Sequence, residues 1–171
     1  MAGTTHHVIR WPERFLPSQS PVHVVNELLI QAPAEMVWEW LARASGWPHW
    51  YPNSRNVRIA GGAVALTADA EFDWVTFGVP VHSRVVEFTA PLSVAWTARA
   101  PGLDAYHAWL LEPVAGGTRV LTEETQHGWL ARLNACLFPR RMHRHHQIWL
   151  EQLGRMARTG THPGMRVLRA T

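Results

Sequence analysis

The sequence has no lysine, a single cysteine and no long apolar run among its 171 residues. Because Cys136 is alone, an internal disulfide is impossible, which agrees with a reducing compartment. No stretch approaches the roughly 18 to 20 apolar residues that span a bilayer, and the N-terminus has no apolar run of signal-peptide length. We therefore expect a soluble, cytoplasmic protein with no membrane span.

Acidic residues are scarce after Glu124, where Glu151 is the single acid among many arginines. A basic segment of this kind could meet nucleic-acid phosphates or a membrane surface. Charge runs are weak signals, however, and they usually mark a solvated helix face or a loose tail. We expect such a face and tail here, and we do not expect nucleic acid as a partner.

Tryptophan, in contrast, is abundant, with ten residues in a chain that is 47% hydrophobic and 17% charged. This composition is typical of a compact domain, and the length suits one domain. Rings of this size need either a core or a ligand to cover them.

Prolines and hydrophobic periodicity divide the chain into elements. Pro12, Pro17 and Pro21 exclude a long regular element from residues 1–21. A strand is predicted over 22–30, a helix directly after Pro33, and a short irregular or helical connection over 46–57. The last element, 129–157, is helical, and Pro139 should bend it or divide it in two. Short strands separated by turn signals are predicted between these elements, over 55–60, 70–76, 79–89, 92–99, 106–113 and 118–127.

Strands in series with short turns form an antiparallel meander, and only the C-terminal helix is long enough to cover its apolar face. The predicted fold class is therefore α+β, with a sheet of about seven strands, a long C-terminal helix and two short helices after the first strand.

This order of elements resembles the helix-grip fold of the START-like (SRPBCC) superfamily, which includes polyketide cyclases, aromatases and lipid-transfer proteins. The resemblance is carried by IQAPAEMVWEWLA leading into WPHWYP, by VVEFTAPLSVAW, by HAWLLEPVAGGTRVLTEETQHGW and by the last helix. It implies a curved sheet wrapped around the C-terminal helix, with a cavity between them for a hydrophobic ligand. It also implies a lead-in over 1–21, the domain over 22–158 and a basic tail over 159–171.

The stretch 106–124 is predicted to form a hairpin whose register decides which side chains face inward. If 114–117 form the loop, Pro113 faces Thr118, and the other pairs are counted outward from there. The directly opposed pair of Glu112 and Arg119 belongs in water, so that face should be solvated. The opposite face, which we expect inside, carries Leu111, Val120, Trp109, Thr122, His107 and Glu124.

His107 and Glu124 are the candidate catalytic residues, since this register places them directly opposite each other. Cβ atoms of such a pair lie roughly 4.5 to 5.5 Å apart, so imidazole and carboxylate can form a hydrogen bond. A lone carboxylate in an apolar cavity would be costly, and the histidine gives it a partner. We expect the pair to recognise a ligand. The alternatives are a structural hydrogen bond that only satisfies two buried polar groups, and proton transfer.

A cavity wall of aromatic side chains with a few polar groups is the usual composition of a small-molecule site. Proline-limited segments hold rings in place, which favours Trp50 or Tyr51 at the border of the cavity. The alternative is that both rings only cap the first helix. The predicted ligand-binding residues are Trp50, Tyr51, Phe72, Trp74, Trp96, His107, Trp109, Thr122, Glu124, His145 and Trp149.

His143, His145 and His146 suggest a zinc site on the last helix. Their spacing converges poorly on one ion, and no Cys-x-x-Cys or His-Glu-x-x-His motif accompanies them. We expect one histidine to face the cavity and the others to be solvated, with no metal and no other cofactor.

The predicted function is the binding of a small hydrophobic or aromatic ligand, polyketide-like or lipid-like, in the internal cavity. The alternative is an enzyme of the polyketide cyclase or dehydratase type that uses the His–Glu pair. A third hypothesis is a regulatory or nucleic-acid-associated role for the arginine-rich C-terminus. Both a monomer and a homodimer are compatible with the sequence.

Overall fold

A computed structural model describes residues 8–159 of the chain. Most of the expected basic tail, 160–171, and the first residues of the lead-in, 1–7, lie outside the described residues. Within the described range, no helix is long and apolar enough to cross a membrane.

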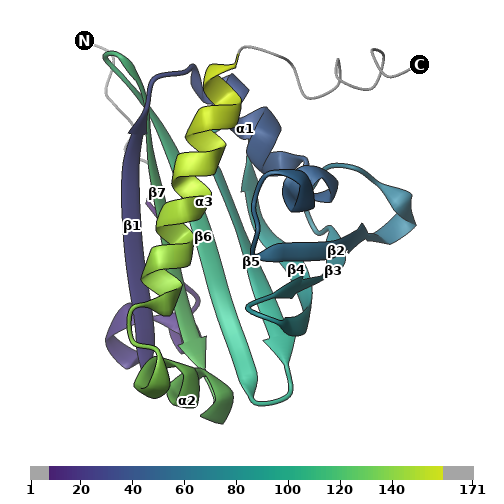
Figure 1. The fold of residues 1–171 in the computed structure, drawn as a ribbon, viewed down its shortest axis with the longest axis vertical. Helices are drawn as coiled ribbons and strands as arrows, with labels where there is room; N and C mark the ends of the chain where they lie inside the picture. The colour runs from purple at the N-terminus through teal and green to yellow at the C-terminus, as the bar shows by residue number, and fades with distance from the viewer. Residues whose placement is uncertain (1–7, 160–171) are drawn as a thin grey trace.

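Seven antiparallel strands form one curved sheet in the order β1-β7-β6-β5-β4-β3-β2 (Figure 1). The predicted antiparallel meander is confirmed, because every strand from β2 to β7 pairs with its neighbour in sequence and β1 closes on β7. The strands are β1 Val22–Ile30, β2 Ser54–Ile59, β3 Glu71–Thr76, β4 Val79–Thr89, β5 Ser93–Ala100, β6 Leu103–Val114 and β7 Gly117–His127.

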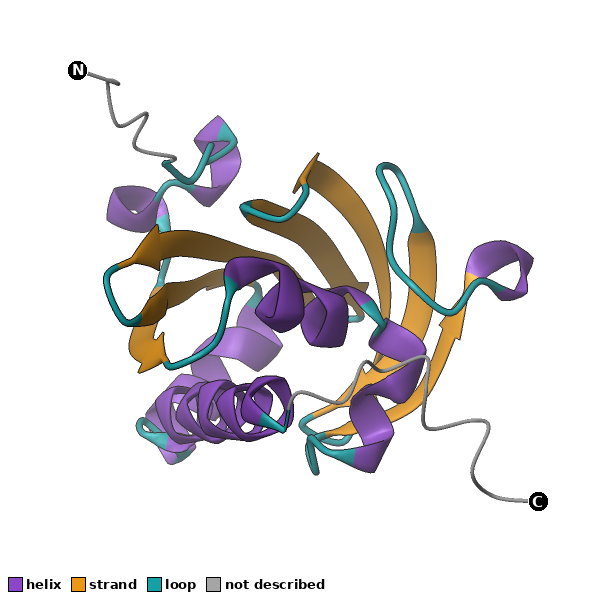
Figure 2. Cartoon of the chain, turned by 90° about the horizontal axis from the view of Figure 1, so that it is seen from above, coloured by secondary structure: helices purple, strands orange, loops and turns teal. Residues whose placement is uncertain are grey.

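Two helices replace the single C-terminal helix at the point where Pro139 interrupts it. Phe138 precedes the proline and has φ −136° and ψ 63°, outside the helical region, as the clash with a following proline ring favours. α2 (Trp129–Leu137) ends there, and α3 (Arg141–Arg158) begins after it. α3 lies across the concave side of the sheet beside β1 (Figures 1 and 2).

The remaining helices close the other end of the concave side. α1 (Ala34–Ala42) follows β1 and packs on α3, and the 3₁₀ segment η3 (Ala44–His49) leads into β2. Short 3₁₀ turns also occur at η1 (Glu13–Phe15), η2 (Pro17–Gln19) and η4 (Ala60–Gly62). Trp47 of η3 is fully buried, and its indole N–H donates to the Leu41 carbonyl at 2.9 Å. This bond fixes the aromatic connection against the end of α1.

The core on the concave side is a network of aromatic rings centred on Trp149 of α3. Tyr51 stacks on it with ring centroids 4.3 Å apart, and Trp47 and Trp109 meet it edge-on at 5.1 and 5.0 Å. Trp74 and Trp96 lie within 6.3 Å of the same ring. Five of the ten tryptophans therefore belong to the network that joins α3 to the sheet.

The convex face of the sheet is not wholly solvated as the hairpin register suggested. Glu112 and Arg119 do form an exposed ion pair there. Farther along β6, however, Tyr106 and Ala108 are buried in a second cluster with Phe15 of the lead-in. Solvation of the whole face was wrong because residues before β1 fold back over the sheet, and the Tyr106 hydroxyl donates to the Arg10 carbonyl at 3.2 Å.

The predicted register of the β6–β7 hairpin is confirmed, although its loop is shorter than expected. Val114 pairs with Gly117, so the loop is Ala115-Gly116 rather than the whole of 114–117. The extra pair extends the ladder without shifting it, and Pro113 still faces Thr118.

Candidate functional site

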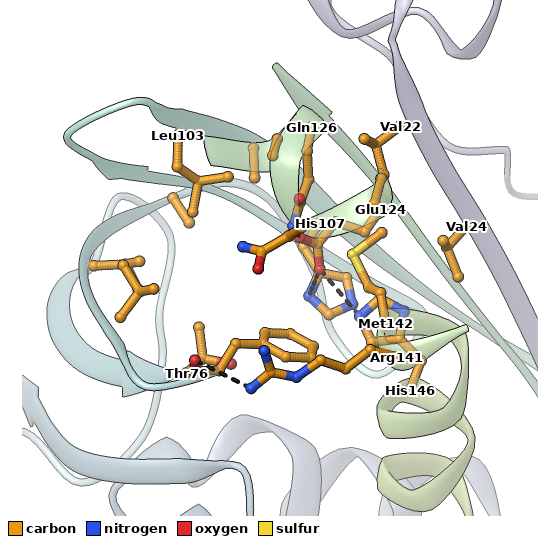
Figure 3. A pocket seen from close by; sticks show the side chains of 18 of the residues that line it. Val22, Val24, Thr76, Leu103, His107, Glu124, Gln126, Arg141, Met142 and His146 are labelled. Carbon is orange, nitrogen blue, oxygen red and sulfur yellow. Dashed lines mark hydrogen bonds and ion pairs between the residues drawn. The ribbon is translucent and has the colours of Figure 1, made fainter. Parts of the chain in front are cut away.

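A cavity of about 80 Å³ lies between the concave face of the sheet, α2 and α3 (Figure 3). Its wall is mainly apolar, with residues from β1, β3, β4, β5, β6, β7 and both C-terminal helices. Of the residues predicted from the sequence, it is lined by Tyr51, Trp74, Trp96, His107, Glu124 and Trp149.

The polar part of this wall is a buried cluster around Glu124 of β7. The predicted pairing with His107 of β6 is confirmed, and His107 Nδ1 lies 3.2 Å from Glu124 Oε2. His146 Nε2 of α3 lies 3.1 Å from the same oxygen, while the Gln126 amide donates to Glu124 Oε1 at 2.5 Å. The other nitrogen of His107, Nε2, is 2.7 Å from the Thr122 hydroxyl. Three separate elements therefore converge on one carboxylate.

The two imidazoles of this cluster also contact each other. The rings of His107 and His146 are stacked, with centroids 4.8 Å apart and planes 14° from parallel. Their exposed fractions are 3% and 1%, and that of Glu124 is 8%. Nδ1 of His146 has no hydrogen-bond partner among residues 8–159. The side chains of the cluster thus contact other protein groups and have little contact with solvent.

Burial and mutual contact determine the charges of the cluster. Burial holds the pKa of His107 well below its ordinary value, more strongly than the nearby Glu124 carboxylate raises it. Burial alone would raise the pKa of Glu124, but His107 together with the bonds from His146 and Gln126 keeps that pKa below its ordinary value. At neutral pH the cavity wall therefore carries an ionised carboxylate facing a neutral His107.

The mouth of the cavity lies beside α2 and the turn between β3 and β4. Arg141 reaches from α3 towards the Thr76 end of β3, as Figure 3 shows, and its Nη2 donates to the Phe77 carbonyl at 3.4 Å. Its guanidinium lies 5.4 Å from the ring centroid of Phe77 and 5.6 Å from that of Phe138. These three residues partly cover the entrance.

The other predicted site residues lie behind the wall or beside the mouth. Phe72 and Trp50 are buried in the main core, and Trp109 packs on His107 with ring centroids 5.4 Å apart. Thr122 touches the cluster through its hydroxyl. His145 is half-buried against the Phe77 ring, 5.2 Å away, and is not part of the polar cluster.

His146 takes the place that we had assigned to His145. The sequence leaves the choice open, because His145 and His146 both border the apolar stripe of α3. Both histidines stand three or four residues from Met142 and from Trp149, so helical spacing does not distinguish them. Gln126 was also missed, although it follows Glu124 by two residues and must share its face of the strand.

Comparisons with known proteins agree with this architecture. Residues 21–158 match the family described as polyketide cyclase / dehydrase and lipid transport. The crystal structure of hypothetical protein jhp0584 from Helicobacter pylori is 34% identical, with a TM-score of 0.83 over 91% of this chain and 99% of that one. Comparison with proteins of curated function found no match.

More distant solved structures share the fold. TTHA0849 from Thermus thermophilus has a TM-score of 0.67 at 18% identity, over 82% of this chain and 99% of that one. The di-domain ARO/CYC StfQ from the steffimycin biosynthetic pathway has a TM-score of 0.66 at 14% identity, over 82% of this chain and 52% of that one. The match over residues 21–158, together with the Helicobacter pylori relative, shows that this chain belongs to the polyketide cyclase / dehydrase and lipid transport family.

Proposed function

We propose that the protein binds a small, mainly apolar ligand in this cavity, with a hydrogen-bond donor of the ligand directed at Glu124. The observation that carries the proposal is a buried carboxylate, with its pKa held below the ordinary value, on a mainly apolar cavity wall. An ionised carboxylate accepts about four hydrogen bonds. His107, His146 and Gln126 supply three contacts, which leaves room for one more donor.

The size of the cavity limits the ligand. Sites for drug-sized molecules enclose roughly 300 to 1,000 Å³, and this cavity encloses about 80 Å³. A compact ring or short chain with one hydroxyl or amine group fits this space. A long polyketide or acyl chain would require Arg141 and Phe138 to move away from the mouth.

Enzymatic turnover of the cyclase or dehydratase type is the second candidate, and it is favoured by two imidazoles meeting one carboxylate on the cavity wall. Efficient general acid–base groups have pKa values near the working pH. The pKa values of His107 and Glu124 are both lowered, which makes each a weak base at neutral pH. Ligand recognition is therefore a better candidate function for the cluster than proton transfer. If the pure protein converted a bound ligand into a product, enzymatic turnover would become the better candidate.

Native mass spectrometry of freshly purified protein, followed by titration of a panel of phenols, alcohols and amines, tests the proposal. Titrations are monitored by tryptophan fluorescence, since Trp96 and Trp149 line the cavity. Loss of a hydrogen bond to a charged group costs about 1.5 to 3 kcal/mol. Glu124→Gln should therefore weaken binding of the best ligand about 10- to 150-fold.

Glu123→Gln is the matched control, because Glu123 is the preceding residue of β7 and pairs with His23 instead of facing the cavity. It should bind the ligand as the unmodified protein does. Equal affinity in the Glu124 variant, or an equal loss in both variants, would contradict the proposed role of the cavity carboxylate.

A further inference from the structure

The cluster around Glu124 also has the donor set of a metal site. His107, Glu124 and His146 each offer one ligand atom, and these atoms all lie within 4.8 Å of one another. They come from β6, β7 and α3, so the fold rather than local sequence brings them together. All three residues are buried. A carboxylate and two imidazoles are a common set of protein ligands for zinc and for non-haem iron(II).

We propose that His107, Glu124 and His146 bind one divalent first-row transition-metal ion. The proposal goes beyond ligand recognition by the cavity and does not depend on it. The no-metal expectation from the sequence considered only the histidines of one helix, where His143 and His145 diverge from His146. The folded chain instead supplies two of the ligands from the facing hairpin.

The distances suit an ion at the centre of the cluster. Ligand atoms about 2.1 Å from one ion lie roughly 3.0 to 3.4 Å apart at octahedral or tetrahedral angles. Glu124 Oε2 lies 3.2 Å from His107 Nδ1 and 3.1 Å from His146 Nε2. The two imidazole nitrogens are at most 4.8 Å apart, and at that limit one ring would have to shift before both could reach the same ion.

Neighbouring groups already orient two of the three ligands. With a metal on His107 Nδ1, the imidazole proton would be on Nε2, which would donate a hydrogen bond to the Thr122 hydroxyl oxygen 2.7 Å away. The Gln126 amide holds the other oxygen of Glu124 at 2.5 Å. Outer partners of this kind fix the ring orientation of metal-bound histidines.

One side of the cluster opens on the cavity, which leaves coordination positions for other ligands. His107, Glu124 and His146 all line that cavity, and its volume of about 80 Å³ has room for several waters. Three protein ligands with an open position are typical of catalytic rather than structural zinc sites. The fourth ligand would be a water or an oxygen atom of a small molecule in the cavity.

The test is titration of the full chain, first treated with a chelator, with Zn²⁺ by calorimetry and with Co²⁺ by visible absorption. The expected result is one ion per chain. Glu124→Gln and His146→Gln should each weaken binding by at least about 10- to 100-fold, the loss that even an outer partner of a metal ligand produces. Circular dichroism and thermal unfolding establish that each variant is folded.

Surface histidines are the main source of a false positive, so the matched control is the double variant His143→Gln/His145→Gln on α3. It should keep one bound ion with unchanged affinity. Thr122→Val preserves the shape of the side chain and should still weaken binding about 10- to 100-fold. The proposal is overturned if the unmodified protein takes up no ion stoichiometrically, or if binding survives Glu124→Gln and is lost in the double variant.

Discussion

Replacement of Trp149 by alanine tests whether the aromatic network holds α3 and the cavity together. Trp149 is 1% exposed, and its ring contacts Tyr51 of the aromatic connection and Trp109 of β6. Loss of a buried tryptophan or phenylalanine side chain typically costs about 3 to 5 kcal/mol. Because the ring joins α3 to both the sheet and the connection, we expect a cost at the upper end of this range.

Thermal and urea-induced unfolding measure this cost directly. For a chain of this size, about 1 kcal/mol corresponds to a shift of roughly 2 to 4 °C in Tm, so Tm should fall by about 10 to 20 °C. Trp129→Ala is the matched control, since Trp129 stands on the neighbouring helix but is 66% exposed. It should change stability by less than about 1 kcal/mol.

Indole should partly rescue the Trp149→Ala variant, because an apolar cavity shaped by a missing side chain binds small aromatic molecules. A ligand at about 100 times its Kd adds roughly 2.7 kcal/mol of stability. Indole should therefore raise the Tm of this variant by several degrees more than it raises the Tm of the Trp129→Ala variant. A loss below about 1 kcal/mol for Trp149→Ala, or equal losses in the two variants, would refute the central role of this ring.

Two further predictions concern the outer face of the sheet and the β6–β7 turn. Phe15→Ala should lower the free energy of unfolding by about 3 kcal/mol in urea titrations, because Phe15 is buried against Tyr106; an unchanged midpoint would mean that the lead-in does not stabilise the fold. Gly117→Ala should be more destabilising than Gly116→Ala in the same assay. A Cβ at Gly117 would lie 2.1 Å from the Ile30 carbonyl oxygen, whereas one at Gly116 meets nothing within 4 Å, so equal costs would contradict this steric argument.

The fold could be predicted because the turn residues, the prolines and the order of the predicted elements all indicate the same arrangement. Turn residues separate the strands. Pro139 divides the last helix, because its ring clashes with the preceding turn and it has no backbone N–H to donate. The hairpin register followed from the loop placed at 114–117, and the charged pair of Glu112 with Arg119 then decided which face points inward. A mistake of two residues in the loop did not matter, since the shorter loop adds a pair at the end of the same ladder.

The polar cluster was only half predictable, because its third side comes from tertiary packing. A helix turns about 100° per residue, so His145 and His146 border the apolar stripe from opposite sides. Which of them meets Glu124 depends on where α3 lies relative to β7, and the helix sequence does not contain that information. The buried Tyr106 on the convex face escaped prediction for the same reason, since its cover comes from residues before β1.

The contacts of Glu124 explain how a carboxylate can be buried in the wall of this cavity. An isolated ionised carboxylate in an apolar interior is strongly destabilising, yet Glu124 keeps its charge because β6, β7 and α3 each direct a polar group at it. Those groups satisfy the carboxylate without neutralising it when His107 is uncharged. The cavity wall therefore carries a buried carboxylate next to free space. A ligand donor or a divalent ion would complete the same arrangement, and the Glu124→Gln variant removes the charge on which both depend.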